Sequence, residues 1–190
     1  LKEFYHIYPL WGRYPDFLSK KSLVLFEEIT KFGNILLEAL DTFSPDEIRK
    51  HYNEPLYKMS KSSDQNLMRV IHYPPLRDSD HPDEIRAAAH TDINLITLLI
   101  SGSQPGLQVM DKNKNWVDIK SKKGQIVINT GDMLKECSNG YFPSTVHRVI
   151  NPGVKKNVSR FSIPLFFHPR GDVVLSKKYT ADEYLFKRLK

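Results

Sequence analysis

The sequence predicts a mainly β fold with flanking α-helices, in which a jelly roll, or double-stranded β-helix, is buttressed by helices from the N-terminal third. From residue 67 onward, short runs of β-branched and aliphatic residues recur and are separated by turn signals. That arrangement is typical of an all-β sandwich or jelly roll. The first third instead shows apolar residues at helix-like spacing, so we expect helices outside the β core. We divide the chain into a helical support region, residues 1–60, and a jelly-roll domain, residues 61–190.

Length and composition indicate a folded chain with a core of its own. The 190 residues are 40% hydrophobic with mixed charge, which argues against disorder. The single cysteine, Cys137, excludes a disulfide within the chain and suggests a reducing compartment. No apolar run reaches the length of a membrane span, and no signal-peptide pattern opens the sequence. We therefore expect a cytoplasmic location and no membrane partner.

The net charge of +6 raises the question of a nucleic-acid partner. The lysines are scattered beside turn residues, which is typical of solvated loop charge. No helix-turn-helix, zinc-finger or RNP-type motif accompanies them, so we expect no nucleic-acid partner. The sequence also lacks a G-x-S-x-G elbow, a Walker A loop, a G-x-G-x-x-G turn after a strand and paired cysteines for zinc.

The N-terminal third is predicted to hold one long and one short helix. Residues 1–16, with several aromatic residues and two prolines, are expected to form an irregular segment that packs on a neighbour. Residues 19–40 carry apolar residues with a broadly helical period. Ser44 is expected to cap the second helix, with Pro45 at its first position and Asp46 in an acidic first turn. Both helices would support the β core.

Residues 67–73 are predicted to form the first strand of the β core, closed by two prolines. Alternation along a strand puts Arg69, Ile71 and Tyr73 on one face. A buried arginine is costly unless it meets an anion, so Arg69 is a candidate for binding a carboxylate of a substrate or co-substrate. A structural ion pair with an Asp or Glu is the alternative. The polar residues 78–83 predict a surface loop near the mouth of the site.

Residues 89–100 are predicted to form the next strand, which begins with a histidine and a carboxylate. Residues i and i+2 of a strand share a face, so we expect His90 and Asp92 to lie side by side as two neighbouring ligands of a metal ion. His147, in another strand-like run, is the candidate third ligand. Two histidines and one carboxylate form the facial triad of non-haem Fe(II) oxygenases. Asn94 points inward by the same alternation, either as a substrate contact or as an amide satisfied within the core.

The remaining runs complete the predicted β core. Residues 107–110 and 116–119 flank a Lys-Asn-Lys-Asn turn and predict a hairpin, and residues 125–129 predict a further strand. In the last strand, Arg160 and Ser162 share a face by alternation. An arginine presents a planar fork suited to a carboxylate, and a serine hydroxyl adds one more donor.

These motifs resemble the HxD…H…RxS pattern of the 2-oxoglutarate/Fe(II) oxygenase superfamily, and in particular its isopenicillin N synthase-like branch. The segments that carry the resemblance are His90-Thr91-Asp92, His147-Arg148-Val149, Arg160-Phe161-Ser162, Gly106-Leu107-Gln108-Val109 and Ile71-His72-Tyr73-Pro74. Members of this branch carry a longer N-terminal helical region, so the resemblance implies that the support region is incomplete here.

The resemblance also implies cofactors and an activity. The predicted triad would bind Fe(II), and the distal carboxylate of 2-oxoglutarate would be held by Arg160, Ser162 and Tyr73. The implied reaction is the O2-dependent oxidation of a small organic substrate, by hydroxylation or desaturation, with release of succinate and CO2. Arg69 and Asn94 are the candidate residues for contacting the substrate. The sequence predicts neither the identity of the substrate nor an oligomeric state.

Two other functions fit part of the pattern. In isopenicillin N synthase the Arg-x-Ser pair binds the peptide substrate and 2-oxoglutarate is not used, so an oxidase or cyclase of that kind is the nearest enzymatic alternative. A non-catalytic metal-binding jelly roll is the second alternative, although such a site needs no carboxylate clamp. The remaining histidines are predicted to be structural or surface residues: His6, His51, His72, His81 and His168.

Overall fold

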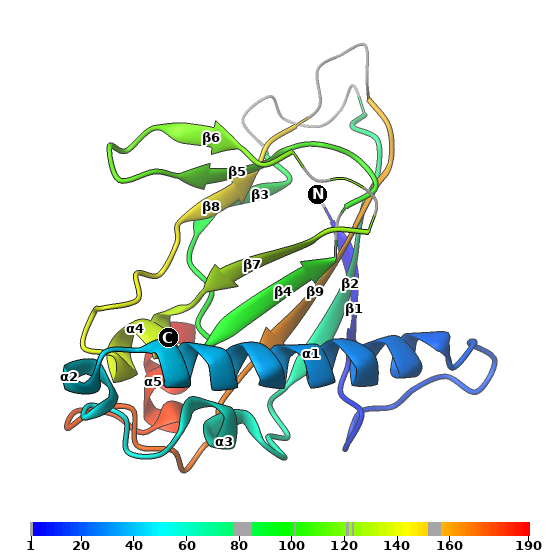
Figure 1. The fold of residues 1–190 in the computed structure, drawn as a ribbon. Coiled ribbons are helices and arrows are strands. Elements are labelled where there is room, and N and C mark those ends of the chain that lie inside the picture. Colours follow the sequence, from blue (N-terminus) through cyan, green and yellow to red (C-terminus); the bar gives the residue numbers. More distant parts are fainter. Residues whose placement is uncertain (1, 78–84, 101, 121, 123, 152–156) are drawn as a thin grey trace.

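Two antiparallel β-sheets face each other in the computed structural model, and helices cover the outer face and one end of the larger sheet (Figure 1). The structure describes residues 2–77, 85–100, 102–120, 122, 124–151 and 157–190. Within these residues, the larger sheet has the strand order β1-β2-β9-β4-β7 and the smaller sheet the order β3-β8-β5-β6. The predicted jelly roll with flanking helices is confirmed. The surface loop expected at residues 78–83 lies outside the described residues.

The strands of the larger sheet are β1 (Glu3–Ile7), β2 (Leu67–Tyr73), β9 (Arg160–Phe167), β4 (Ile96–Ile100) and β7 (Ile126–Thr130). The strands of the smaller sheet are β3 (Ala87–His90), β8 (His147–Val149), β5 (Leu107–Met110) and β6 (Trp116–Asp118). The helices are α1 (Lys21–Phe43), α2 (Asp46–Arg49), α3 (Leu56–Ser60), α4 (Asp132–Cys137) and α5 (Ala181–Leu189).

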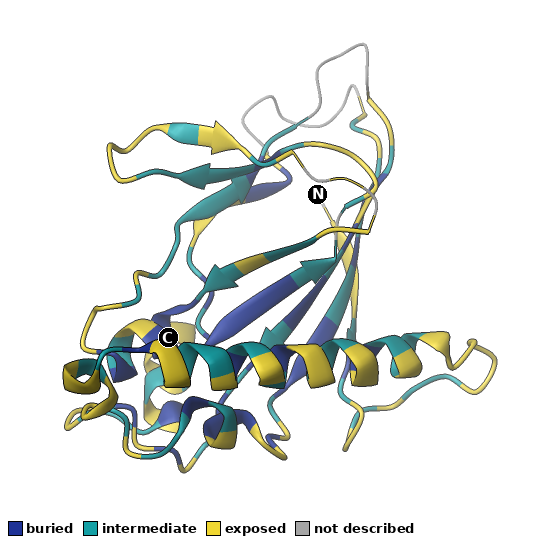
Figure 2. Ribbon diagram, viewed as in Figure 1, coloured by how far each residue is buried: buried dark blue, intermediate teal, exposed yellow. Residues whose placement is uncertain are grey.

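The main hydrophobic core lies between α1 and the larger sheet. Buried residues concentrate on the inner strands of that sheet (Figure 2). Leu37 of α1 and Phe167 of β9 are both fully buried there. Gly33 lets the helix approach closely, because a Cβ atom at this position would lie 2.0 Å from the ring of Phe167. The described part of the chain has no helix that is both long and apolar enough to cross a membrane.

The N-terminal third differs from the sequence prediction at two points. Residues 3–7 form β1, which pairs with β2 at the edge of the larger sheet, so the expectation of an irregular segment over residues 1–16 is wrong there. This strand is mostly exposed, so it lacks the apolar alternation that marks a half-buried strand. The helical support region therefore also contributes a strand, and the division of the chain at residue 60 stays a prediction.

The second difference concerns the end of the long helix. Ser44 follows α1, and its hydroxyl donates to the carbonyl oxygen of Leu40 at 2.6 Å. The expectation that Ser44 caps the next helix is wrong, because Pro45 occupies that position and Ser44 makes no capping bond to α2. The acidic first turn at Asp46 is present.

The single strand predicted over residues 89–100 is two strands that belong to different sheets. β3 ends at His90 in the smaller sheet, and β4 begins at Ile96 in the larger one. Between them, the carbonyl oxygens of Asp92 and Asn94 accept hydrogen bonds from the N–H groups of Asp132 and Met133 at 2.8 and 3.1 Å. The first N–H groups of a helix have no partner within it. The start of α4 therefore takes acceptors that a continuous strand would have used.

Candidate functional site

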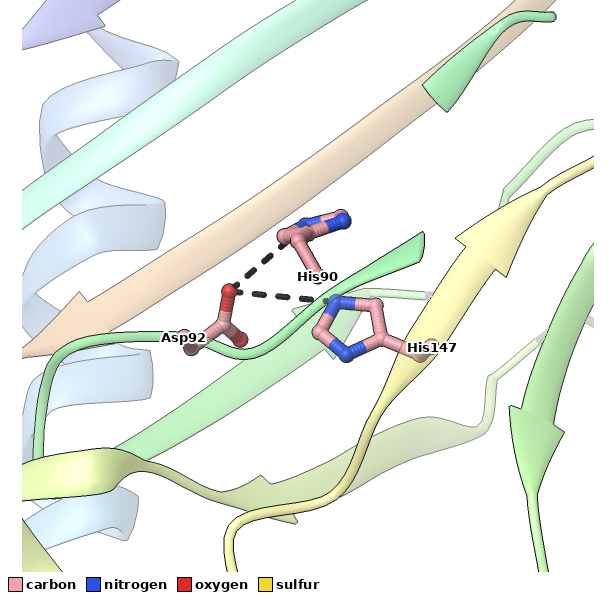
Figure 3. A group of neighbouring side chains, drawn as sticks. All are labelled: His90, Asp92 and His147. Atoms are coloured by element: carbon pink, nitrogen blue, oxygen red, sulfur yellow. Dashed lines mark ion pairs between the residues drawn. The ribbon is translucent and has the colours of Figure 1, made fainter. Parts of the chain in front are cut away.

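Three predicted metal ligands come together at the mouth of the sandwich, where the two sheets meet (Figure 3). His90 of β3 lies directly opposite His147 of β8 in the antiparallel register, and their ring centroids are 4.3 Å apart. Asp92 lies just beyond the end of β3, with Oδ1 4.0 Å from Nε2 of His90 and 3.8 Å from Nε2 of His147. The ligand atoms all lie within 4.8 Å of one another. Two imidazoles and one carboxylate on one side fit a metal ion that keeps open positions.

Backbone carbonyls orient both histidine rings. Nδ1 of His90 lies 2.7 Å from the oxygen of Ala88, and Nδ1 of His147 lies 3.0 Å from the oxygen of Thr145. A carbonyl oxygen only accepts, so each Nδ1 carries the hydrogen and each Nε2 presents a lone pair. Burial lowers the pKa of His90, and the neighbouring His147 acts in the same direction. The neutral form that binds metal is therefore favoured.

The carboxylate of Asp92 is oriented from the larger sheet. Its Oδ2 accepts hydrogen bonds from the hydroxyl of Thr97 at 2.6 Å and from the amide of Asn129 at 2.8 Å. Asn94 in turn donates its amide to the hydroxyl of Thr97 at 2.9 Å. Because Oδ2 is occupied, Oδ1 is the oxygen that faces the two histidines. Such outer hydrogen bonds fix a ligand's orientation and tune the metal.

A cavity of about 540 Å³ adjoins the triad and extends between the two sheets. Side chains from both sheets line it, including Thr97 of β4, Val109 of β5 and Phe166 of β9. Leu185 and Leu189 of α5 add an apolar wall. The volume is in the range of sites that enclose a small molecule.

The predicted carboxylate clamp lies inside this cavity. Tyr73 of β2 and Arg160 of β9 are cross-strand partners, and Ser162 lies opposite Ile71. Arg160 is only 2% exposed, and its guanidinium carbon lies 5.3 Å from the centroid of the Tyr73 ring. Its Nε donates to the carbonyl oxygen of Gln104 at 3.1 Å, whereas its buried Nη1 has no hydrogen-bond partner among the described residues.

A buried guanidinium with an unpaired N–H group is costly unless an anion completes it. The distal carboxylate of 2-oxoglutarate would supply that anion, with Ser162 adding a hydroxyl donor. Burial also raises the pKa of Tyr73, so the phenol stays protonated and can donate to the same carboxylate. The residues present therefore fit this co-substrate.

The two substrate candidates have different surroundings. Arg69 lines the cavity on the same face of β2 as Tyr73, as alternation predicts. Asn94 is fully buried, and its amide donates to the carbonyl oxygen of Ile96 and to Thr97. It is not among the residues that line the cavity, and its buried Oδ1 has no hydrogen-bond partner among the described residues, so a substrate contact for Asn94 stays a prediction. The interrupted strand turns Asn94 into the core.

Three residues that contribute to the site were not predicted from the sequence. Thr97 and Asn129 orient Asp92, and His168 lines the cavity although we expected it to be structural or on the surface. Its position could have been found, because His168 continues the alternation that places Arg160 and Ser162 on the inner face of β9. His81 lies outside the described residues.

A sequence model of the 2OG-Fe(II) oxygenase superfamily matches residues 65–169, a stretch that contains the triad and the clamp. The chain belongs to this superfamily. Its cofactors, Fe(II) and 2-oxoglutarate, are those that the triad and the clamp fit.

Individual relatives agree with the family assignment. The chain is 30% identical to a 2-oxoglutarate-Fe(II) type oxidoreductase from Aspergillus fumigatus over 86% of its length and 47% of the relative's. It is 31% identical to 1-aminocyclopropane-1-carboxylate oxidase 5 from Arabidopsis thaliana, over 83% of this chain and 50% of that one. The chain thus spans about half the length of these curated relatives.

Solved structures of the family share the fold. A protein from Shewanella oneidensis, assigned as an oxygenase, superposes with a TM-score of 0.91 at 51% identity, over 99% of this chain and 70% of that one. A full-length protein from Neurospora crassa, in complex with α-ketoglutarate (2-oxoglutarate) and thymine, gives a TM-score of 0.74 at 27% identity, over 99% of this chain and 64% of that one.

Proposed function

We propose that this chain forms the catalytic part of an Fe(II)- and 2-oxoglutarate-dependent dioxygenase that hydroxylates or desaturates a small organic substrate. One observation carries the proposal. The histidine–carboxylate triad and the buried, incompletely paired guanidinium of Arg160 open into the same cavity. A metal site alone would not need the arginine, and a structural arginine would not need the metal ligands.

Each group of residues has a separate task. His90, Asp92 and His147 would hold Fe(II), leaving positions for the co-substrate and O2. Arg160, Ser162 and Tyr73 would bind and orient 2-oxoglutarate through its distal carboxylate. When bound, the two cofactors would supply the O2-dependent oxidation of the substrate, at one C–H bond in a hydroxylation or at two adjacent positions in a desaturation, with release of succinate and CO2. The surrounding apolar wall excludes water and positions the substrate.

Three finer assignments are part of the proposal. The segments around Tyr73 and Leu107 support membership of the isopenicillin N synthase-like branch. The single cysteine and its burial support a reducing, cytoplasmic location. We infer a small-molecule partner, because a cavity of about 540 Å³ suits a small molecule.

Anaerobic titration of the purified chain with Fe(II), with and without 2-oxoglutarate, tests the function. A weak visible charge-transfer band that requires both compounds is the expected result. Asp92→Ala should lose Fe(II) binding, and Arg160→Leu should require far more 2-oxoglutarate for the same band. The exposed Arg49→Leu serves as the matched control and should behave like the wild type.

Two results would contradict the proposal. Fe(II) binding with no band in the presence of 2-oxoglutarate would identify an oxidase that does not use this co-substrate, or a non-catalytic metal site. An Arg160→Leu variant with an unchanged 2-oxoglutarate requirement would show that Arg160 does not bind the co-substrate.

A further inference from the structure

Arg69 presents a positive charge to the cavity, and it has no acidic partner among the residues that the structure describes. Its Nε donates to Nε2 of His6 at 2.7 Å, across the β1–β2 pair. Its guanidinium carbon lies 5.2 Å from the ring centroids of both Phe4 and Phe166. Among the described residues, no Asp or Glu forms an ion pair with it. The alternative of a structural ion pair, which the sequence left open, is therefore not what the structure contains.

His6 does not neutralise this charge. Its Nε2 accepts a hydrogen bond from Arg69, so the ring is neutral. Burial and the positive charge of Arg69 both lower the pKa of His6, which favours the same neutral form. The guanidinium thus keeps its charge, while its Nε is hydrogen-bonded to His6 and its carbon lies near two aromatic rings. The remaining Nη edge is a rigid fork, which suits two oxygen atoms of a carboxylate.

The charge balance of the cavity indicates what that fork binds. Its described lining contains the cationic side chains of Lys2, Arg69 and Arg160, and the single carboxylate of Asp92. Fe(II) and the dianion of 2-oxoglutarate cancel each other, and Asp92 offsets one of the cations. A net positive charge therefore remains in the cavity, and Arg69 carries part of it.

The surface beside the fork is apolar. The ring of Phe166 faces the cavity on β9, and Leu185 and Leu189 of α5 close another side. His168 follows Phe166 by two residues and also lines the cavity, where burial lowers its pKa to about 4 and keeps the ring neutral. The described lining thus offers Arg69 as a charged anchor, with Lys2 as a second cation, and apolar side chains for the rest of the molecule.

We propose that the substrate is a small organic acid whose carboxylate pairs with Arg69 and whose apolar body lies against Phe166 and α5. This inference rests on the proposed dioxygenase function. It adds the chemical class of the substrate and the residue that selects it. Arg160 remains assigned to the co-substrate. Each arginine would therefore bind a different carboxylate, Arg160 that of 2-oxoglutarate and Arg69 that of the substrate.

Calorimetric binding to the Fe(II)- and 2-oxoglutarate-loaded chain, without O2, tests the inference. The probes are phenylacetate, 3-phenylpropanoate and hexanoate, each compared with its neutral amide of the same shape. The wild type should bind at least one acid about tenfold or more tightly than its amide, as hydrogen bonds to a charged group warrant. Arg69→Met should remove this preference, and Arg69→Lys should retain part of it because the charge remains.

Arg148→Met is the matched control. Arg148 of β8 also donates Nε to a side chain, Gln108, and lies 4.0 Å over the ring of Trp116. It is not part of the cavity lining, so its replacement should leave the preference for acids unchanged. Thermal unfolding of each variant checks that it folds. If Arg69→Met does not fold, the reduced preference for acids expected of Arg69→Lys tests the inference instead.

The charge-transfer band in the same samples separates the two proposals. A wild type without the band contradicts the dioxygenase function itself. A wild type with the band that binds none of the acids more tightly than its amide overturns the substrate class alone. The same holds if Arg69→Met, with its band intact, still prefers acids.

Discussion

The hydroxyl of Thr97 donates a 2.6 Å hydrogen bond to Oδ2 of Asp92. The bond joins β4 of the larger sheet to a metal ligand that follows the last residue of β3 in the smaller one. It leaves Oδ1 facing the two histidines, so the orientation of the carboxylate is set before any metal arrives. Thr97 is therefore a positioning residue for the metal centre.

Replacing Thr97 by valine should weaken Fe(II) binding by about tenfold to a hundredfold, which is typical for the loss of an outer-shell partner. Valine keeps the shape but cannot donate, so Asp92 would rotate more freely. Anaerobic Fe(II) titration gives the affinity directly. Thr97→Ser keeps the hydroxyl and should restore most of the binding; equal weakening in both variants would contradict the role of the hydrogen bond.

Gly33→Ala should destabilise the fold. The added methyl group would overlap the ring of Phe167, which is fully buried. Overpacking costs about 1–3 kcal/mol, partly offset by the better helix propensity of alanine of about 1 kcal/mol. Chemical denaturation measures the difference. Combining the change with Phe167→Leu should give less destabilisation than the two single changes added together, and strict additivity would argue against this contact.

The thiol of Cys137 should be inert in the folded chain. It is 1% exposed, and burial raises its pKa to about 12. Only the thiolate reacts, so an aromatic disulfide reagent at pH 8 should modify Cys137 in denaturant but not in buffer. A Thr42→Cys variant places a thiol on the exposed surface of α1 as a positive control. Modification of native Cys137 at the rate of that control would show that the core opens readily.

The metal-free chain should lose stability as the pH falls from 7 to 5, in part through His168. Burial lowers the pKa of His168 to about 4, below the value of an unfolded histidine. The unfolded state therefore binds more protons in this range, and the stabilisation present above pH 6.5 is lost on acidification. The loss from this residue is about 2 kcal/mol at pH 5.

Denaturation of His168→Gln at both pH values isolates that contribution. The variant cannot titrate at this position, so its stability should fall by about 2 kcal/mol less than that of the wild type. An identical pH dependence in the two proteins would show that His168 is not shielded from solvent.

Much of the fold followed from local patterns in the sequence. The strand over residues 67–73 was predicted with the bounds that β2 has, because its composition and its closing prolines are both local signals. The hairpin of β5 and β6 likewise depends on adjacent residues. The edge strand β1 was missed because its pairing with β2, rather than any periodicity of its own, defines it.

The site was predicted by residue type better than by geometry. His90 and Asp92 do lie together, but not as neighbours on one strand. Their arrangement depends on the α4 N–H groups that take the carbonyl oxygens of residues 92–94, and Gly131 makes this approach possible because a Cβ there would lie 2.2 Å from the oxygen of Asn94. A contact between segments almost forty residues apart has no signal in the spacing of the motif.

The division of the triad between the sheets gives a bound ion a mechanical role. His90 and His147 belong to the smaller sheet, whereas Asp92 is held by Thr97 and Asn129 of the larger one. An ion that bonds to all three ligands is a reversible cross-link between the two halves of the sandwich. Its binding would stabilise the folded chain against unfolding by about 2.7 kcal/mol at an ion concentration of a hundred times the dissociation constant. The same ion that supports the chemistry would therefore also hold together the two sheets that line the cavity.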